Sequence, residues 1–323
     1  MNQNPMQRIT LTLAALVLIA PNTGRAQEKK ATAAANKPIA MGYILQADAE
    51  IKDKAKMIAK LKSSNRDWIV LDRVFTDEKP WTKKDLDEIR KGKPGRKVIA
   101  YLSIGEAEDY RHYWQESWTQ SPPKFILGEN PDWEGNYTVK FWAAEWQNII
   151  LEDVRRIMKQ GFDGLYLDKV DVFELFEYDQ KKDDWIDNHP NPDTKRSYRE
   201  DTVEWVRQVG AEMRKVNKKA LLIPQNASQL LEKPAYVKMI SAIGVEDIFT
   251  NGEEKQADED REYLLAFLKR ASKAKKPVLC IEYCETKPLR TFATQQATKL
   301  GFNLLITDRH LKTLGSVPGT SAK

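Results

Sequence analysis

The chain has 323 residues and a formal net charge of +5, which falls to +3 without the first 26 residues, because these contain Arg8, Arg25 and no acidic residue. So mild a positive charge gives no reason to expect a nucleic acid partner. The remaining length is typical of a single α/β barrel domain.

The N-terminal segment has the features of a signal peptide. Arg8 precedes an apolar run over residues 9–20, and small residues surround Ala26, after which cleavage is expected. The run is short for a membrane span, and no later segment approaches about 18 uninterrupted apolar residues. We therefore predict a signal peptide over residues 1–26 and an exported protein, periplasmic or extracellular, without a membrane span after cleavage. An uncleaved N-terminal anchor is the alternative.

Residues 27–37 are polar and of low complexity, which predicts a flexible linker. Beyond them, short β-rich runs alternate with amphipathic stretches typical of helices. Eight strands are predicted, at residues 40–45, 68–71, 98–103, 164–167, 221–224, 244–249, 278–283 and 303–306. Helices are predicted at 48–61, 81–91, 144–159, 195–216 and 254–274.

This alternation predicts a parallel sheet covered by helices, and eight such units predict a single (β/α)8 TIM barrel. The domain is expected to span residues 38–312, followed by a C-terminal tail over 313–323. An open doubly wound sheet is the alternative fold. A dinucleotide-binding version of it has no support, because no G-x-G-x-x-G motif follows the first strand.

Two predicted connections are long, residues 110–140 after the third strand and 171–192 after the fourth. Long loops after barrel strands often carry function. The first is rich in aromatic residues, which either stack on sugar faces or form a small core beneath their own loop.

Cys280 lies in the predicted seventh strand and Cys284 follows it. The two are expected to be separate thiols rather than a disulfide, unless the chain turns between them.

Carboxylates recur where the predicted strands end. The apolar run Leu165-Tyr166-Leu167 ends in Asp168, with Asp171 three residues later; alone, such an Asp is more often a helix cap. Other strands end near Asp72, Glu106, Glu246 and Glu282. Because these ends meet at one barrel mouth, the pattern favours glycoside hydrolysis, which needs an acid and a second carboxylate.

The sequence predicts neither a cofactor nor a metal. The three histidines are scattered, and no P-loop or serine nucleophile motif is present. A divalent cation bound by the same carboxylates is the alternative.

Several motifs occur in an order similar to that of the endo-α-1,4-polygalactosaminidase family, glycoside hydrolase family 114. They are residues 101–111 (YLSIGEAEDYR), Trp114, residues 139–142 (VKFW), residues 161–168 (GFDGLYLD) and residues 244–246 (GVE). The resemblance spans about residues 39–308. It implies an exported TIM-barrel hydrolase without a cofactor, acting on α-1,4-linked galactosamine or N-acetylgalactosamine polysaccharide, with Asp168 and Glu246 as the catalytic pair.

We interpret Asp168 as the nucleophile and Glu246 as the general acid/base of a retaining enzyme; an inverting enzyme would use the same pair farther apart. Substrate contacts are predicted for Asp72, Tyr101, Glu106, Trp142, Asp171, Asn226 and Glu282, with purely structural roles as the alternative for each. A non-catalytic glycan-binding barrel and another α-glycosidase, such as an α-galactosidase, remain alternative functions. The sequence leaves the oligomeric state open.

Overall fold

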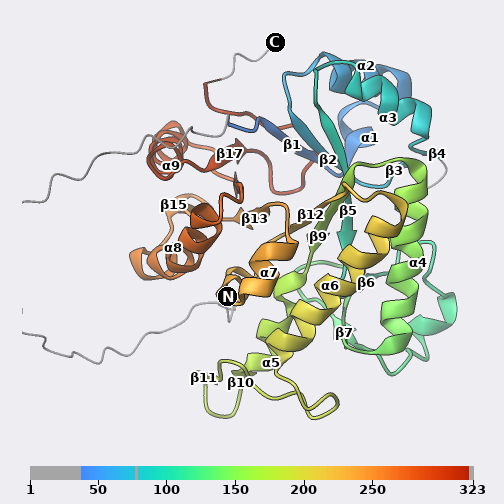
Figure 1. Cartoon of the computed structure of the whole chain (residues 1–323), viewed down its shortest axis with the longest axis vertical. Helices are drawn as coiled ribbons and strands as arrows, with labels where there is room; N and C mark the ends of the chain where they lie inside the picture. The colour runs from blue at the N-terminus through green and yellow to red at the C-terminus, as the bar shows by residue number, and fades with distance from the viewer. Residues whose placement is uncertain (1–37, 77–78, 320–323) are drawn as a thin grey trace, which may run out of the picture.

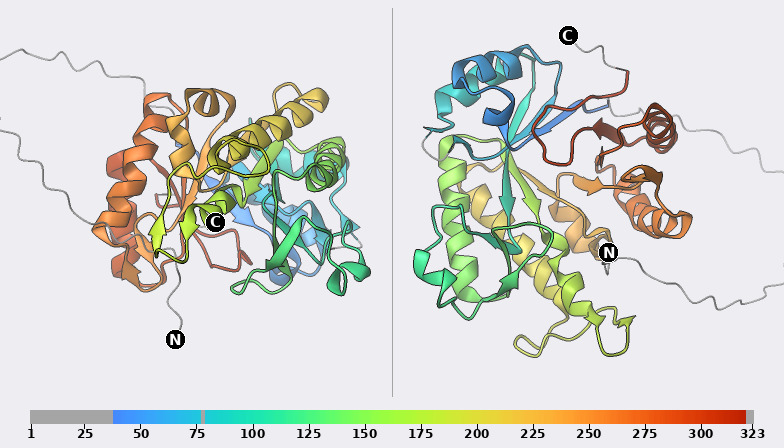
Figure 2. Two further views of the ribbon diagram at one scale, coloured as in Figure 1. Left: turned by 90° about the horizontal axis from the view of Figure 1, so that it is seen from below. Right: turned by 180° about the vertical axis from the view of Figure 1, so that it is seen from behind.

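The computed structural model describes residues 38–76 and 79–319. The predicted signal peptide (1–26) and linker (27–37) lie outside the described residues. The described chain is a mixed α/β domain with parallel strands at its centre and helices around them (Figure 1). Helices α8 and α9 lie on the opposite side of the strands from α2 and α3, as both views of Figure 2 show.

All eight predicted strands are present, and their ends lie within one residue of the expected ones except in the sixth, which ends three residues earlier than predicted. They are β1 (Met41–Ile44), β2 (Trp68–Leu71), β5 (Lys97–Ser103), β9 (Gly164–Asp168), β12 (Leu221–Pro224), β13 (Ile243–Glu246), β16 (Val278–Glu282) and β17 (Asn303–Ile306). The first five form one parallel sheet in chain order, and the last three form a second.

The two sheets join in barrel order. A parallel bridge between Gln225 and Gly244 connects β12 with β13. On the other side β17 neighbours β1, and the Ile39 amide donates to the Asn303 side chain at 2.7 Å. The arrangement is that of a (β/α)8 barrel, as the sequence predicts, although the backbone ladder among the described strands is not continuous around it.

Helices follow the strands along the chain and cover the outside of the sheets. They are α1 (Ala47–Glu50), α2 (Lys54–Ser63), α3 (Lys83–Arg90), α4 (Ala144–Gln160), α5 (Glu174–Glu177), α6 (Tyr198–Val216), α7 (Pro234–Met239), α8 (Asp258–Lys273) and α9 (Lys287–Leu300). The 3₁₀ turns are η1 (Glu116–Thr119), η2 (Val170–Phe173) and η3 (Ser228–Glu232).

Local sequence signals account for several helix ends. Ser197 begins α6 with a capping box that includes Glu200, and Gly161 ends α4 at a left-handed φ of 101°. The single helix predicted over residues 48–61 is instead two, because the chain is extended at Ile51 and Asp53 and the Asp53 side chain caps α2.

Side chains of the barrel strands alternate between two separate apolar clusters. Tyr43, Ile99, Tyr166, Ile223 and Leu305 belong to the cluster inside the barrel. Their strand neighbours, such as Leu165, Leu222 and Leu304, belong to a larger cluster that the helices cover. Because successive side chains of a strand point to opposite faces, each residue's place along its strand decides whether it faces the interior or the helices.

The two long connections contain small strands of their own. The first forms a three-stranded antiparallel sheet from β6 (Glu106–Glu108), β7 (Ile126–Glu129) and β8 (Asn136–Val139). The second contains the hairpin β10 (Tyr178–Asp179) and β11 (Asp184–Trp185). Two more hairpins are β3 (Val74–Thr76) with β4 (Lys79–Pro80), and β14 (Thr250–Asn251) with β15 (Glu254–Lys255).

Residues 313–317 pack against the barrel rather than leaving it at once as a tail. Ser316 forms an antiparallel bridge with Ile306, and Leu314 is buried. Both cysteines are buried free thiols. Among residues 38–76 and 79–319, no helix combines the length and apolar character that crossing a membrane requires.

Gly244 provides a stability test of the barrel interior. A methyl group there would lie 1.9 Å from the Tyr166 hydroxyl oxygen and 2.6 Å from its ring carbon. We expect Gly244→Ala to lower the free energy of unfolding by about 1–3 kcal/mol, measured by urea denaturation, because the fully buried ring must shift. Gly128→Ala is the matched control, since nothing lies within 4 Å of its added methyl group. Equal effects of the two substitutions would contradict this packing argument.

Candidate active site

Asp168 is the last residue of β9 and shares the inward face with Tyr166, two residues earlier. Its Oδ2 accepts a hydrogen bond from the Tyr101 hydroxyl at 2.6 Å. Its Oδ1 accepts from the backbone amide of Lys169 at 2.7 Å and from Gln225 Nε2 at 3.2 Å. The carboxylate is only partly buried, so it is oriented by its neighbours while remaining accessible.

Glu246 ends β13 and also faces inward. Its Oε2 accepts hydrogen bonds from Gln225 Nε2 at 2.6 Å and Asn226 Nδ2 at 3.4 Å. Its Oε1 contacts the Tyr283 hydroxyl. The Glu246 amide donates to Asn226 Oδ1 at 3.1 Å, which fixes the orientation of the Asn226 amide. Glu246 is therefore held from β12 on one side and from the end of β16 on the other.

The Gln225 amide brings the two carboxylates together. Since Nε2 lies 3.2 Å from Asp168 Oδ1 and 2.6 Å from Glu246 Oε2, these two oxygens can be at most about 5.8 Å apart, the sum of the two distances. Tyr43, from β1 inside the barrel, donates to Gln225 Oε1 at 3.3 Å. The sequence-predicted catalytic pair thus shares one hydrogen-bond donor.

The surroundings of Glu246 favour its protonated form. Its enclosed position and the nearby Asp168 charge raise the pKa of Glu246 to about 8, against the opposing hydrogen bond from Tyr283. A carboxyl group that stays protonated at neutral pH can donate a proton, and an adjacent Asp can act as nucleophile or base.

Further acidic groups line the same mouth beside a lysine. Asp171 Oδ2 accepts from Asn226 at 3.3 Å, and burial together with Asp168 raises the pKa of Asp171 despite the opposing charge of Lys169. Glu106 forms a 3.0 Å ion pair with Lys169, and burial raises the pKa of Glu106. The structure therefore places three of the predicted substrate-binding residues, Asp171, Asn226 and Glu106, around the catalytic pair.

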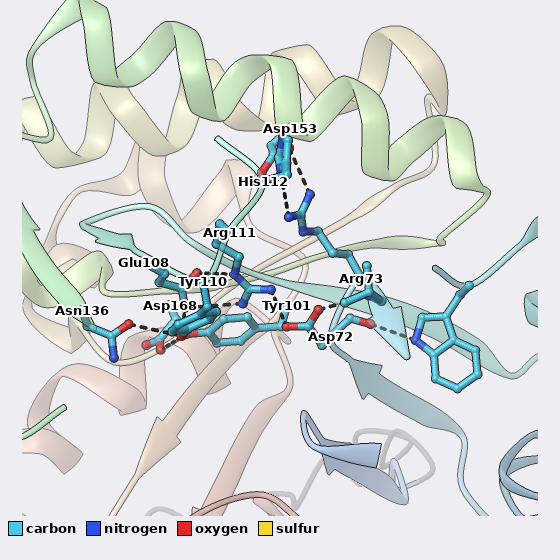
Figure 3. Close-up of polar contacts among 12 residues, drawn as sticks. Asp72, Arg73, Tyr101, Glu108, Tyr110, Arg111, His112, Asn136, Asp153 and Asp168 are labelled. Atoms are coloured by element: carbon cyan, nitrogen blue, oxygen red, sulfur yellow. Dashed lines mark hydrogen bonds and ion pairs between the residues drawn. The ribbon is translucent and has the colours of Figure 1, made fainter. Parts of the chain in front are cut away.

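Asp72 and Tyr101 belong to a polar network that Figure 3 shows. Arg111 donates to Asp72 at 2.7 Å and to Glu108 at 2.6 Å, so the Asp72 charge is compensated within the protein. Tyr101 is buried with its hydroxyl on Asp168. Its contact with Asp168 makes Tyr101 a positioning group for this carboxylate.

Two predicted substrate-binding residues have other surroundings. Glu282 is fully buried, and its oxygens accept hydrogen bonds from the amides of Phe249 and Thr250, the Thr250 hydroxyl and the Cys280 thiol, at 2.6–3.2 Å. It shares the helix-facing side of β16 with Cys280, so it is buried away from the mouth and has no exposed atom for a sugar. This burial argues against its predicted substrate contact.

Trp142 lies in an aromatic cluster at the second long connection. Its ring packs near Phe141, Phe176 and Tyr198, and its Nε1 donates to Asp193 at 2.9 Å. Phe176 and Asp193 lie between β9 and α6, Tyr198 begins α6, and the Trp142 side chain remains partly exposed. A substrate contact for Trp142 stays a prediction.

Most aromatic residues of the first long connection form a small core. Trp114, Trp118, Phe125 and Tyr137 pack in ring contacts of 4.7–5.6 Å, and Phe125 reaches Trp146 of α4. Of the sequence's two alternatives, this supports the local core. Tyr110 and Trp133 differ, since they are 50% and 42% exposed.

The sequence analysis missed Gln225, Tyr283 and Arg309 as site residues. Gln225 and Tyr283 could have been found by counting: each lies two residues beyond an inward-facing apolar residue, Ile223 and Ile281. Arg309 lies in the loop after β17, where no strand alternation indicates the direction of its side chain. Among residues 38–76 and 79–319, no three His, Cys, Asp or Glu side chains gather as metal ligands would.

Solved structures share this fold. The glycoside hydrolase domain of PelA from Pseudomonas aeruginosa has a TM-score of 0.62 and 20% identity, covering 87% of this chain and 99% of that domain. Aspergillus fumigatus Ega3, solved in complex with galactosamine, has a TM-score of 0.62 and 17% identity, covering 91% of this chain and all of that one. At these identities the likeness concerns the fold.

Sequence relatives are closer. An uncharacterised protein of Deinococcus radiodurans is 34% identical over 247 residues, which are 76% of this chain and 74% of that protein. An uncharacterised protein of Methanocaldococcus jannaschii is 34% identical over 234 residues, 71% of this chain and 64% of that protein. The model of Glycoside-hydrolase family GH114 matches residues 69–322, which include the carboxylate pair and both strands that carry it. This chain therefore belongs to Glycoside-hydrolase family GH114.

Proposed function

We propose that this glycoside hydrolase cleaves α-1,4-linked galactosamine or N-acetylgalactosamine polysaccharide, with Asp168 and Glu246 as its two catalytic carboxylates. The observation that carries the proposal is the shared Gln225 amide, which holds an accessible carboxylate beside a carboxyl group whose pKa is about 8. That pairing supplies the acid and the second carboxylate that glycoside hydrolysis requires.

The distance limit favours a retaining mechanism. Retaining enzymes place their carboxyl groups about 5–5.5 Å apart, and inverting enzymes about 6.5–9.5 Å apart. The two hydrogen bonds of Gln225, at 3.2 and 2.6 Å, limit the facing oxygens to a separation of at most about 5.8 Å, which is below the range of inverting enzymes. Asp168 then attacks the anomeric carbon while Glu246 protonates the leaving oxygen, and Glu246 later activates the water that releases the sugar.

The substrate class rests on family membership and on charge. Ega3, which shares the fold, was solved with galactosamine bound. In this chain Asp168, Asp171 and Glu106 surround Lys169. A deacetylated galactosamine polymer is a polycation, so excess carboxylate at the mouth would attract it.

The experiment that tests the substrate class is incubation of the mature protein with galactosaminoglycan, α-galactan and chitosan, followed by mass spectrometry of the products. We expect oligosaccharides from galactosaminoglycan and weaker binding of its deacetylated form as salt increases. Cleavage of α-galactan alone would instead indicate an α-galactosidase-like enzyme. Binding without products would indicate a glycan-binding barrel.

Export is part of the same proposal, since a polysaccharide of this kind lies outside the cell. The motif around Ala26 supports cleavage there. Expression in a secreting bacterial host should give a mature chain that starts at Gln27 by mass, and retention of the first 26 residues would contradict it.

We expect Asp168→Asn to lower kcat/KM for the cleaved glycan by about 10³-fold or more, because the amide is a far weaker nucleophile. Asp258→Asn is the matched control: this carboxylate is exposed at the start of α8 and pairs with Arg261. Thermal melting of both variants confirms that they fold. Near-native hydrolysis by a folded Asp168→Asn protein would remove Asp168 from the mechanism.

The pH dependence of hydrolysis should report Glu246. Its raised pKa keeps the acid form dominant at neutral pH, so kcat/KM should decline as pH rises through about 8. Glu246→Gln cannot release a proton and should lose both this decline and most of the activity. A decline that persists in the residual activity of Glu246→Gln would assign it to another group.

A further inference from the structure

Tyr283, Arg309 and Asp247 form a linked group beside Glu246. Arg309 makes two hydrogen bonds to Asp247, at 2.9 and 3.1 Å. Its guanidinium carbon lies 4.2 Å from the centre of the Tyr283 ring. The Tyr283 hydroxyl in turn contacts Glu246 Oε1. Residues that follow β13, β16 and β17 thus converge on one oxygen of the carboxyl group.

The two oxygens of Glu246 have different partners, and this difference locates its proton. Oε2 faces amide groups of Gln225 and Asn226, which donate hydrogen bonds and cannot accept one from a carboxylic acid. Oε1 faces a phenol hydroxyl, which can donate or accept. When Glu246 is protonated, the proton therefore belongs on Oε1, where Tyr283 can accept its hydrogen bond.

We propose that Tyr283, held in place by the Arg309–Asp247 pair, is a positioning residue that makes Oε1 the proton-delivering oxygen of Glu246. The inference rests on the proposed function of Glu246 as the catalytic acid. The backbone of Asp247 also helps to hold this group in place. Asp247 follows Glu246 directly in a left-handed conformation, φ 51°, and its amide donates to the Ile281 carbonyl at 3.0 Å. Holding a non-glycine residue there costs energy that the surrounding contacts must supply.

The proton transfer balances without any other reactant. As the bond between the anomeric carbon and the leaving oxygen breaks, the Oε1 proton moves to that oxygen and Asp168 forms a bond to the anomeric carbon. Glu246 becomes a carboxylate, and the Tyr283 hydroxyl turns to donate to it. This new charge-assisted hydrogen bond stabilises the anion just as it forms, which is when stabilisation accelerates the reaction.

A cavity borders Tyr283 and Arg309. Its volume is about 560 Å³, and Tyr283, Arg309, Cys284, Thr307 and Asp308 contribute to its lining. This volume is within the range of about 300–1,000 Å³ usual for ligand sites. Glu246 is not among its lining residues, so the cavity lies beside the contact of Tyr283 with Arg309 and not at Oε1 itself.

Several other groups act on the protonation of Glu246 and must stay constant in a test. Asp168, Asp171 and Asp247 oppose its ionisation by their charge. Arg309 interacts with it at longer range, and the hydroxyls of Tyr43 and Tyr166 lie nearby inside the barrel. A substitution of Tyr283 alone removes one hydrogen bond and leaves all these charges in place.

The test compares the whole wild-type protein with Tyr283→Phe, by carbon-13 NMR titration of the Glu246 carboxyl and by kinetics on two substrates. One substrate has a sugar leaving group, and the other carries the same sugar chain on 4-nitrophenol, which leaves without protonation. We expect the pKa of Glu246 to increase by about one unit in Tyr283→Phe, since the phenol donates to the anion. We expect kcat/KM to fall about 10–100-fold with the sugar leaving group and far less with nitrophenol.

Two further variants test the role of Arg309 and control for the loss of a phenol hydroxyl. Arg309→Gln removes the cation over the ring and one partner of Asp247. Because the Arg309 charge also acts on Glu246, this variant is compared by kinetics alone, and its loss should be weaker than that of Tyr283→Phe but again larger with the sugar leaving group than with nitrophenol. Tyr178→Phe is the matched control, because this phenol also donates to a carboxylate, Asp183, but in the β10–β11 hairpin. An unchanged pKa of Glu246 in folded Tyr283→Phe, or equal losses on both substrates, would overturn the proposal. If the wild-type protein cleaves neither substrate, the proposed function fails, while the NMR titration still decides the role of Tyr283.

Discussion

The proposed catalytic pair, Asp168 and Glu246, is held together by the contact of one amide, Gln225 Nε2, with both carboxylates. Its position in the barrel explains why this contact matters. Asp168 belongs to the five-stranded sheet and Glu246 to the three-stranded one, and on this side of the barrel the sheets meet at the backbone bridge between Gln225 and Gly244. The residue that joins the two sheets through its backbone therefore also joins the two catalytic groups through its side chain. Small shifts of Gln225 would therefore alter the separation of the Asp168 and Glu246 carboxyl groups, on which the proposed chemistry depends.

Electrostatic balance in the mouth comes from cations that are each held by their own carboxylates. Lys169 pairs with Glu106, Arg111 with Asp72 and Glu108, and Arg309 with Asp247. Asp168 and Glu246 are bound instead by neutral donors, the amides and phenols of neighbouring strands. Neutral donors orient a carboxyl group without fixing it in its charged form as strongly as an ion pair would. Glu246 can consequently alternate between acid and carboxylate, as a proton-transferring group must.

Period-two alternation explains which parts of the site the sequence could predict. Asp168 continues the inward face of Tyr166, so its place in the mouth followed from the strand prediction. Glu282 has the opposite parity, with Cys280 on the helix-facing side, and counting from the apolar run would have excluded it. Gln225 has the same parity as the inward-facing Ile223, so counting along the strand places it in the mouth. An amide, however, is not one of the two carboxyl groups that glycoside hydrolysis requires, so the sequence did not predict it as a site residue. Trp142 and Arg309 lie on loops, where no periodicity constrains direction, so neither could be placed from sequence.

The sequence by itself determined the eight strands and most of the longer covering helices, because burial periodicity and capping residues act over a few neighbouring positions. Its motifs predicted Asp168 and Glu246 as the carboxylate pair, and the structure brings these two side chains onto one amide. Only the tertiary structure decided that the loop aromatics form a local core, that residues 313–317 pack on the barrel, and that Tyr283 contacts Glu246. These contacts join residues far apart in the chain. Their geometry follows from strand register, barrel order and side-chain packing acting together, which no local pattern specifies.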